Sequence, residues 1–329
     1  MKNIFDFATK ELTQDAFLIW LFENYTDPTL EKLSLGLINE FCALKQGEII
    51  ENLKTKAQDH KIDIYVSIST NKREIALFIE DKTFSNEHNQ LSTYNNYIDK
   101  LDKDKEIFKI YYKTNIIDDN EKTKIDSANS YTNIKWKIYD INKIIPIFEK
   151  YISTNNVIVT QYIDYIKRIN DALKNKNLPT EQNSHFDLLK WKAFFIHIKK
   201  NLSNKNYYRC EIDTWRNKYV YIRFFDKHQD NIPHLEIRSR DCLNNQFQAR
   251  ILCHGVSYDD YHKNETTLFD IKNRSEFSTT KLRKNKNGKP TLPKLVGITE
   301  KIQISNEKNF TSKLEEYLKI YSNIMKNWQ

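Results

Sequence analysis

The sequence predicts an α+β protein, with a mixed β-sheet flanked by helices in the first half and a second α+β domain after it. Apolar residues recur at helical spacing on both sides of a group of strand-like runs, which is typical of such a fold. The chain has 329 residues, enough for two domains. Because 39% of the residues are hydrophobic and 13% are aromatic, we expect a globular chain with real cores.

The elements of the first half follow from these patterns. Apolar residues at helical spacing predict a helix over 14–25 with Thr13 as its N-cap, and Pro28 opens the next helix. Polar residues mark the turns between the strands. The expected order is helix 14–25, helix 29–44, strands 46–57, 62–68 and 74–80, helix 87–101, strand 106–113, a loop over 114–132, strand 134–139, helix 141–152 and helix 156–174.

A polar stretch with a proline, residues 174–184, indicates the domain boundary. We assign residues 1–175 to the first domain and 180–329 to an α+β accessory domain for recognition, regulation or dimerisation. The expected elements of the accessory domain are helix 186–200, strands near 207–213, 218–225 and 234–239, a basic loop, and helix 311–328.

Composition narrows the classes of function. The formal net charge of +8 suits a polyanionic partner, although solvated lysines in a Lys- and Asn-rich chain explain it equally well. The five glycines form no dinucleotide-binding loop and no P-loop. The four cysteines lack CxxC spacing and indicate reduced thiols of a cytoplasmic protein. Since no apolar run approaches ~18 residues, we expect no membrane association.

One strand ends in charged residues. The apolar run over 74–80 leads into Glu80, Asp81 and Lys82. Side chains of a strand alternate between its faces, so Glu80 and Lys82 point to one face and Asp81 to the other. Acid–spacer–lysine triplets also occur at 59–61 and 270–272. Taken alone, the triplet therefore favours a solvated ion pair at a strand end.

A second acid lies in the preceding strand. If the hairpin turn centres at about residue 71, pairing partners sum to roughly 142 and Asp63 lies opposite about residue 79, beside Glu80. An unpaired carboxylate inside an apolar strand is costly, and a bound divalent cation would relieve that cost. Asp63 and Glu80 therefore predict a Mg²⁺ site that Mn²⁺ can also fill, with the Asp81 carbonyl as a further ligand.

A metal ion at this place suits phosphodiester hydrolysis. It would polarise the scissile phosphate and lower the pKa of a bound water. Lys82 would orient that water and stabilise charge on the phosphorane. A general-base role for Lys82 would require a depressed pKa.

The helix after this strand carries two further candidates. Gln90 and Tyr94 lie four residues apart and so share one helical face. A short loop brings that face back over the strand end, where the amide and the phenol would contact a phosphate, a metal-bound water or a base. The alternative is an ordinary helix surface with Tyr94 half packed.

At this point the chain resembles a known family. Ile62-Asp63, Glu80-Asp81-Lys82 and Gln90-Leu91-Ser92-Thr93-Tyr94 resemble the motifs of the PD-(D/E)XK nuclease superfamily, whose QxxxY-containing bacterial branch has such a glutamine helix. The N-terminal run over 8–21 also looks like the opening helix of bacterial members. The resemblance covers roughly residues 1–150. Ile62 stands where the family name has a proline, a position without a chemical role.

The resemblance implies a restriction-endonuclease-like fold and assigns roles to individual residues. Asp63 and Glu80 would be metal ligands and Lys82 the catalytic lysine. Glu11 would be an additional acid near the metal. A plain first-turn acid favoured by the helix dipole is the alternative for Glu11.

The accessory domain has one basic loop, 281–289, in which Lys284 and Lys286 would track a phosphate backbone. A mobile solvated loop is the alternative. We therefore predict a cytoplasmic, Mg²⁺-dependent nuclease that hydrolyses DNA, in bacterial restriction or anti-phage defence by family analogy. An RNA substrate, a homodimer, and a non-catalytic nucleic-acid-binding or protein-interaction component with the same fold remain open.

Overall fold

The structure is a computed structural model, and its chain divides into two units, Met1–Asp171 and Ala172–Gln329. The expected boundary stretch, 174–184, lies just inside the second unit. The described residues are 3–326 without 8–10, 60, 84, 86, 88, 101–103, 153–155, 204–207, 216–217, 227–232, 253–277, 280–282, 285–289 and 292–294.

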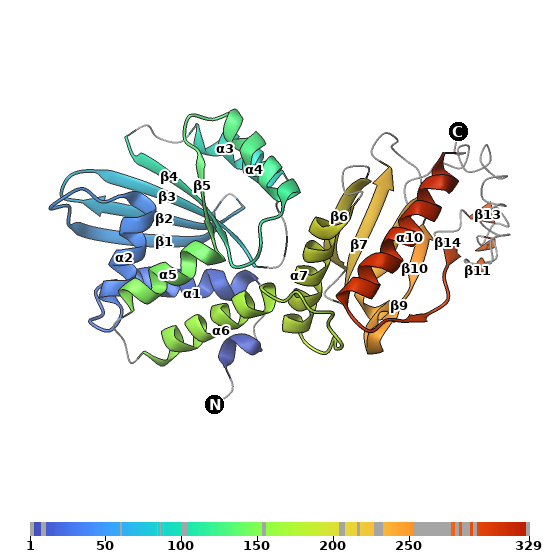
Figure 1. The fold of residues 1–329 in the computed structure, drawn as a ribbon. Coiled ribbons are helices and arrows are strands. Elements are labelled where there is room, and N and C mark those ends of the chain that lie inside the picture. The colour runs from blue at the N-terminus through green and yellow to red at the C-terminus, as the bar shows by residue number, and fades with distance from the viewer. Residues whose placement is uncertain are drawn as a thin grey trace. The chain divides into compact units, whose positions relative to one another are not determined.

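The first unit is built on a mixed five-stranded sheet with strands in the order β1-β2-β3-β4-β5 (Figure 1). The first three strands pair antiparallel, and β4 and β5 continue the sheet in parallel. This confirms the predicted mixed α+β architecture. The strands are β1 Ile50–Asp59, β2 Ile62–Thr70, β3 Glu74–Lys82, β4 Glu106–Lys113 and β5 Trp136–Asp140.

The burial of the strands explains their places in the sheet. In β2, side chains alternate between buried and half-buried, as expected for a strand with one face in a core. In β3, every side chain from Ile75 to Lys82 is buried, as expected for a central strand covered on both faces. The charged end of β3 is therefore held inside the protein rather than at its surface.

Helices cover both faces of this sheet. Phe17 of α1 stacks on Tyr162 of α6 and on Phe148 of α5, which unites these helices on one face. Gly36 lets α2 approach α5, because a Cβ there would lie only 2.4 Å from Cγ of Tyr151. Helices α3 and α4 pack on the other face. The helices are α1 Glu11–Glu23, α2 Glu31–Cys42, α3 Gln90–Ile98, α4 Asp119–Ser130, α5 Ile141–Tyr151 and α6 Val157–Leu173, with a 3₁₀ turn at Ile4–Asp6.

Two expectations for this unit are wrong. Residues 114–132 are not a loop, because α4 forms there with Asp118 as its N-cap; the Asp118 side chain accepts the N–H of Glu121. Few apolar residues mark this helix, which buries Ile125 and Ala128, so its periodicity is weak. Thr13 is not an N-cap, because α1 already begins at Glu11.

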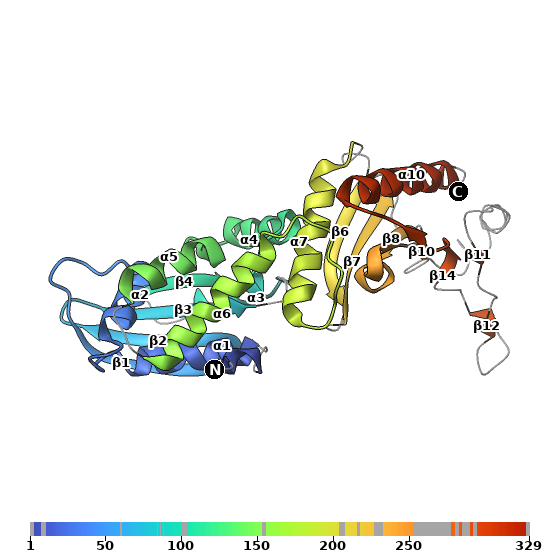
Figure 2. The same cartoon turned by 60° about the horizontal axis from the view of Figure 1, so that its bottom comes forward.

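The second unit has a six-stranded sheet with the order β11-β14-β10-β8-β7-β6 (Figure 2). Helices α7 and α10 share a core with one face of this sheet, and Ser184 forms a capping box with Asp187 at the start of α7. The helices are α7 His185–Asn201 and α10 Glu307–Met325, with 3₁₀ turns at Ser239–Asp241 and Leu243–Asn245. The strands are β6 Tyr208–Trp215, β7 Tyr219–Asp226, β8 His234–Arg238, β9 Gln246–Phe247, β10 Ala249–Leu252, β11 Ser278–Thr279, β12 Arg283–Lys284, β13 Pro290–Thr291, β14 Leu295–Ile298 and β15 Ile302–Gln303. Within the described part of the chain, no helix combines the length and the apolar character needed to cross a bilayer.

Candidate active site

The hairpin of β2 and β3 brings two acids together. Ile64 pairs with Ile79, so pairing partners sum to 143 and the same register places Asp63 opposite Glu80. The sum expected from the sequence was one residue lower. Asp63 Oδ2 also accepts the backbone N–H of Asp81 at 2.9 Å. The start of β2 is thereby fixed against the end of β3.

Lys82 lies between the two carboxylates. Its Nζ is 2.6 Å from Oε1 of Glu80 and 3.7 Å from Oδ2 of Asp63. Glu80 is fully buried, whereas the Asp63 side chain keeps 20% of its surface exposed. The site predicted from spacing is thus a compact group of three ionisable side chains, and Asp63 gives it contact with solvent.

Burial dominates the electrostatics of Glu80. Burial, together with the negative charge of Asp63, raises the pKa of Glu80 from 4.5 to about 8, although Lys82 acts in the opposite direction. Near neutral pH the Glu80 carboxyl therefore holds a proton. A cation placed between Asp63 and Glu80 would release that proton and stabilise the ionised pair.

Helix α3 places Gln90 and Tyr94 beside this group. Glu87 caps the helix, because its carboxylate accepts the N–H groups of Asn89 and Leu91. The Tyr94 hydroxyl donates to the carbonyl of Lys61 at 2.8 Å, and Nε2 of Gln90 donates to that hydroxyl at 3.3 Å. Tyr94 lies near the acids.

Tyr94 packs in one core cluster with Ala76 and Phe78, which share a face of β3 with Glu80 and Lys82. Burial raises the pKa of Tyr94, and the charges of Glu80 and Asp63 raise it further. The structure therefore brings together Asp63, Glu80, Lys82, Gln90 and Tyr94.

A second polar cluster lies behind this site, on the opposite face of the sheet. The Asp81 side chain is fully buried there and accepts a hydrogen bond from Nε2 of Gln14 in α1. Burial, then the charge of Asp15, raises the pKa of Asp81 well above its usual range. Gln14 Oε1 accepts the hydroxyls of Thr114 at 3.0 Å and Tyr162 at 3.2 Å.

Sequence reasoning missed Gln14. The signal was present, because Gln14 shares a helical face with the buried Leu18 and Leu21, four and seven residues further on. A buried glutamine on an apolar helix face needs partners for both its amide groups. Here the partners are Asp81 of β3, Thr114 just after β4, and Tyr162 of α6.

Three predicted residues fall where the structure gives no side chain. Helix α1 begins at Glu11, but the position of the Glu11 side chain lies outside the described part. The backbone of Lys284 belongs to β12, which pairs with β13. The Lys284 side chain and the whole of Lys286 lie outside the described part of the chain. The roles assigned to these three residues stay predictions.

The two carboxylates at the strand ends suit a hard divalent cation, but they supply only part of its ligands. Asp63 and Glu80 offer carboxylate oxygens, and Mg²⁺ is usually held by one or two carboxylates together with waters and substrate phosphates. Among the residues whose side chains are described, no group of three or more His, Cys, Asp or Glu is arranged to hold a metal ion. The metal hypothesis therefore depends on two protein carboxylates.

Comparisons with protein-family models, curated proteins and solved structures give no significant match for this chain.

Proposed function

We propose that the first unit is a Mg²⁺-dependent nuclease of the PD-(D/E)XK superfamily, with a restriction-endonuclease-like fold, that hydrolyses phosphodiester bonds of DNA. The observation that carries this proposal is the meeting of Asp63, Glu80 and Lys82 on one face of the sheet, from two strands. A buried acid with a raised pKa beside a second acid and a lysine is a common arrangement at catalytic sites.

Each residue has a distinct task in this proposal. Asp63 and Glu80 would hold the ion, which supplies Lewis acidity and a more acidic bound water. The Lys82 ammonium, 2.6 Å from Glu80, would orient the attacking water and stabilise negative charge on the phosphate. The Gln90 amide would donate its second N–H to a phosphate oxygen, and Tyr94, whose hydroxyl accepts the first N–H, would hold that amide in place.

A cleavage assay with the purified full chain tests this proposal. Supercoiled plasmid, linear duplex, single-stranded DNA and RNA are each incubated with Mg²⁺, Mn²⁺ or EDTA. We expect metal-dependent cleavage that falls at least ~10²-fold in Asp63→Asn and Lys82→Met. The matched controls are Asp270→Asn and Lys272→Met, from a triplet of the same type, which should cut as the parent does.

Two results would overturn the proposal. One is a folded parent that cuts none of the four substrates with either metal. The other is an Asp63→Asn variant that cuts at the parental rate. Salt-dependent binding without cleavage would favour the non-catalytic nucleic-acid-binding component instead.

A further inference from the structure

The face of the sheet that carries the candidate site continues past it onto β1 and β2. Asp63, Tyr65 and Ser67 alternate with buried residues along β2 and so point to the same face. Tyr65 and Ser67 are only half-buried, and α1 contacts β1 and β2 from the opposite side. In the described part of the first unit, this stretch of the face is therefore open to solvent.

Three lysines gather on this open stretch. Lys54 and Lys56 of β1 are exposed and lie directly opposite Ser67 and Tyr65 in the antiparallel register. Directly opposite residues share a face, and Lys56 Nζ lies 6.0 Å from the centre of the Tyr65 ring. Lys105, just before β4, reaches the same place. We call Lys54, Lys56 and Lys105 the lysine strip.

Hydroxyl groups accompany the lysine strip. Lys105 Nζ donates to Ser67 Oγ at 3.1 Å and lies 3.5 Å from the Tyr65 hydroxyl. The Tyr65 ring packs against Phe78, which fixes its position on the face. Ammonium and hydroxyl groups are donors that bind phosphate oxygens in nucleic-acid complexes.

The lysine strip leads to the candidate site. Asp63 and Ser67 are four residues apart on β2, which corresponds to about 13 Å along the strand. Asp63 belongs to the candidate site. Lys56 lies opposite Tyr65, which is the next residue after Asp63 on the same face of β2. A nucleic-acid strand bound along the lysine strip would thus reach the carboxylates of the candidate site at one end of the strip.

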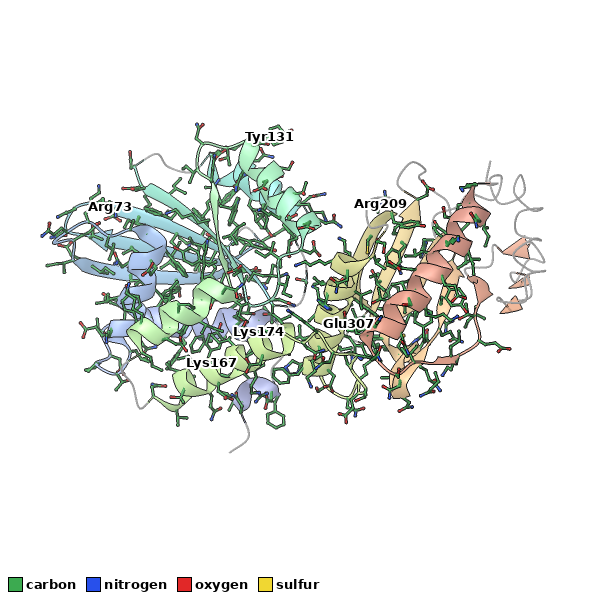
Figure 3. The ribbon with its side chains drawn as sticks, viewed as in Figure 1. Arg73, Tyr131, Lys167, Lys174, Arg209 and Glu307 are labelled. Atoms are coloured by element: carbon green, nitrogen blue, oxygen red, sulfur yellow. The ribbon has the colours of Figure 1, made fainter. Side chains whose placement is uncertain are left out.

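Within the residues that the structure describes, the charge of the lysine strip is not neutralised. Of the carboxylates the structure describes, none lies within 4 Å of the three ammonium groups, whose described partners are a ring and two hydroxyls. Other surface lysines are paired: Lys150 lies 3.0 Å from Glu40, and Lys167, labelled in Figure 3, lies 2.6 Å from Glu149.

One acid borders the strip. Glu74 lies opposite Ser69, at the end of the strip away from Asp63, and accepts a hydrogen bond from the Ser69 hydroxyl.

We infer that the lysine strip binds the phosphodiester backbone of a nucleic-acid strand and guides it to Asp63 and Glu80. This inference rests on the proposed nuclease function and adds to it the path of the substrate. Three ammonium groups on one face complement a polyanion, and the desolvation cost of Lys54 and Lys56 is low because these two side chains are exposed.

Binding in EDTA tests the inference apart from catalysis. Fluorescence anisotropy with labelled single-stranded DNA, duplex DNA and single-stranded RNA is recorded between 50 and 200 mM salt, roughly the range in which phosphate contacts are resolved. The variant is the triple substitution Lys54→Gln, Lys56→Gln and Lys105→Gln in the full chain. The control is Lys143→Gln, Lys150→Gln and Lys167→Gln on α5 and α6, which changes the net charge equally.

We expect the strip variant to bind at least ~10-fold more weakly at low salt, with the slope of log K against log salt reduced by about 2–3, since each lost phosphate contact removes ~0.7–0.9. The control should bind as the parent does. Parental affinity and slope in the strip variant would overturn the inference, as would an equal loss in both variants.

Two further outcomes are decisive. If polyglutamate binds the parent as tightly as the oligonucleotides do and the strip variant loses this binding too, the strip is a general polyanion surface and the inference fails. If the parent cuts nothing with Mg²⁺ but the strip variant still loses binding, the nuclease proposal fails while the backbone path stands.

Discussion

The ends of β3 and β4 carry two lysine–carboxylate pairs side by side, and only one of them looks like a reactive site. The strands run parallel, with Glu80 next to Tyr111 and Lys82 next to Lys113. Lys113 Nζ lies 2.9 Å from Oε1 of Glu121, much as Lys82 lies 2.6 Å from Glu80. By pairing distance alone the two lysines are nearly equivalent.

Their surroundings differ. Neither side chain of the Lys113–Glu121 pair is exposed, and Glu121 also accepts the Tyr111 hydroxyl at 2.6 Å and the N–H of Glu87 at 3.1 Å. Lys113 further donates to the carbonyl of Ser85. The contacts of the Glu121 carboxylate all converge on its Oε1 and form a buried network that ties α4 to β4. A buried lysine with a carboxylate therefore does not by itself mark a site.

The Lys82–Glu80 pair is also buried, but it is open in the sense that it lies next to a partly exposed side chain. It faces a second acid, Asp63, that solvent reaches, and its own carboxylate has a pKa raised to about 8. Incomplete compensation and access to solvent distinguish the candidate active site from its neighbour.

The largest expected effect is on stability at the closed pair. Lys113→Met should lower the free energy of unfolding by about 3–5 kcal/mol, because Glu121 would be left buried and uncompensated. Lys82→Met should cost much less, because Glu80 can hold its proton instead. Urea unfolding of the two variants measures the contrast.

A second variant serves as the control for the closed pair. Lys113→Met combined with Glu121→Leu should recover most of the loss, since apolar residues often replace a buried ion pair without cost. Equal destabilisation by Lys113→Met and Lys82→Met would remove the distinction between the two strand ends.

The open pair should give the folded state a characteristic pH dependence. The raised pKa of Glu80 means that the folded chain holds a proton which the unfolded chain has lost between about pH 4.5 and 8. The resulting stabilisation is complete below pH 4.5 and is lost as the pH rises through 8. In EDTA, the parent should lose up to about 1.4 kcal/mol per pH unit in this window relative to Glu80→Gln.

Denaturant unfolding of both proteins from pH 5 to 8 measures this difference. If the free energy of unfolding changes with pH in the same way for the parent and for Glu80→Gln, Glu80 does not titrate between pH 5 and 8. Added Mg²⁺ should stabilise the parent more at pH 8 than at pH 6, because the ion binds the ionised carboxylate.

The smallest effect is expected behind the site. Gln14→Met keeps the size of the side chain but leaves Asp81 without its amide donor, at a cost of about 1–3 kcal/mol. Because the Asp81 N–H holds Asp63, the Mg²⁺ concentration for half-maximal cleavage should also rise several-fold. Cleavage titrations with Mg²⁺ measure this shift.

Ser34→Ala is a suitable control for Gln14→Met. The Ser34 hydroxyl is buried and donates to the carbonyl of Leu21, which joins α2 to α1 without a hydrogen bond to Asp81 or Gln14. The Ser34→Ala variant should be less stable than the parent but should need the same Mg²⁺ concentration for half-maximal cleavage. An unchanged requirement in Gln14→Met would limit Gln14 to a structural role.

Local spacing predicted much of the first unit. The alternation of β2, the apolar run of β3 and the short hairpin between them were sufficient to place Asp63 within one residue of Glu80 in register. Helix α4 escaped prediction because its burial of Ile125 and Ala128 depends on contacts with a distant sheet rather than on a strong pattern of its own.

By itself, the sequence determined which side chains share a face: Glu80 with Lys82 on the strand, and Gln90 with Tyr94 on the helix. These relations depend only on the fixed repeats of strand and helix. Only the tertiary structure decided that Lys113 is closed and Lys82 open, and that Gln14 supports Asp81 from 67 residues away. The physical reason is that burial, and with it the pKa of Glu80, arises from packing among segments far apart in the chain, which no local repeat encodes.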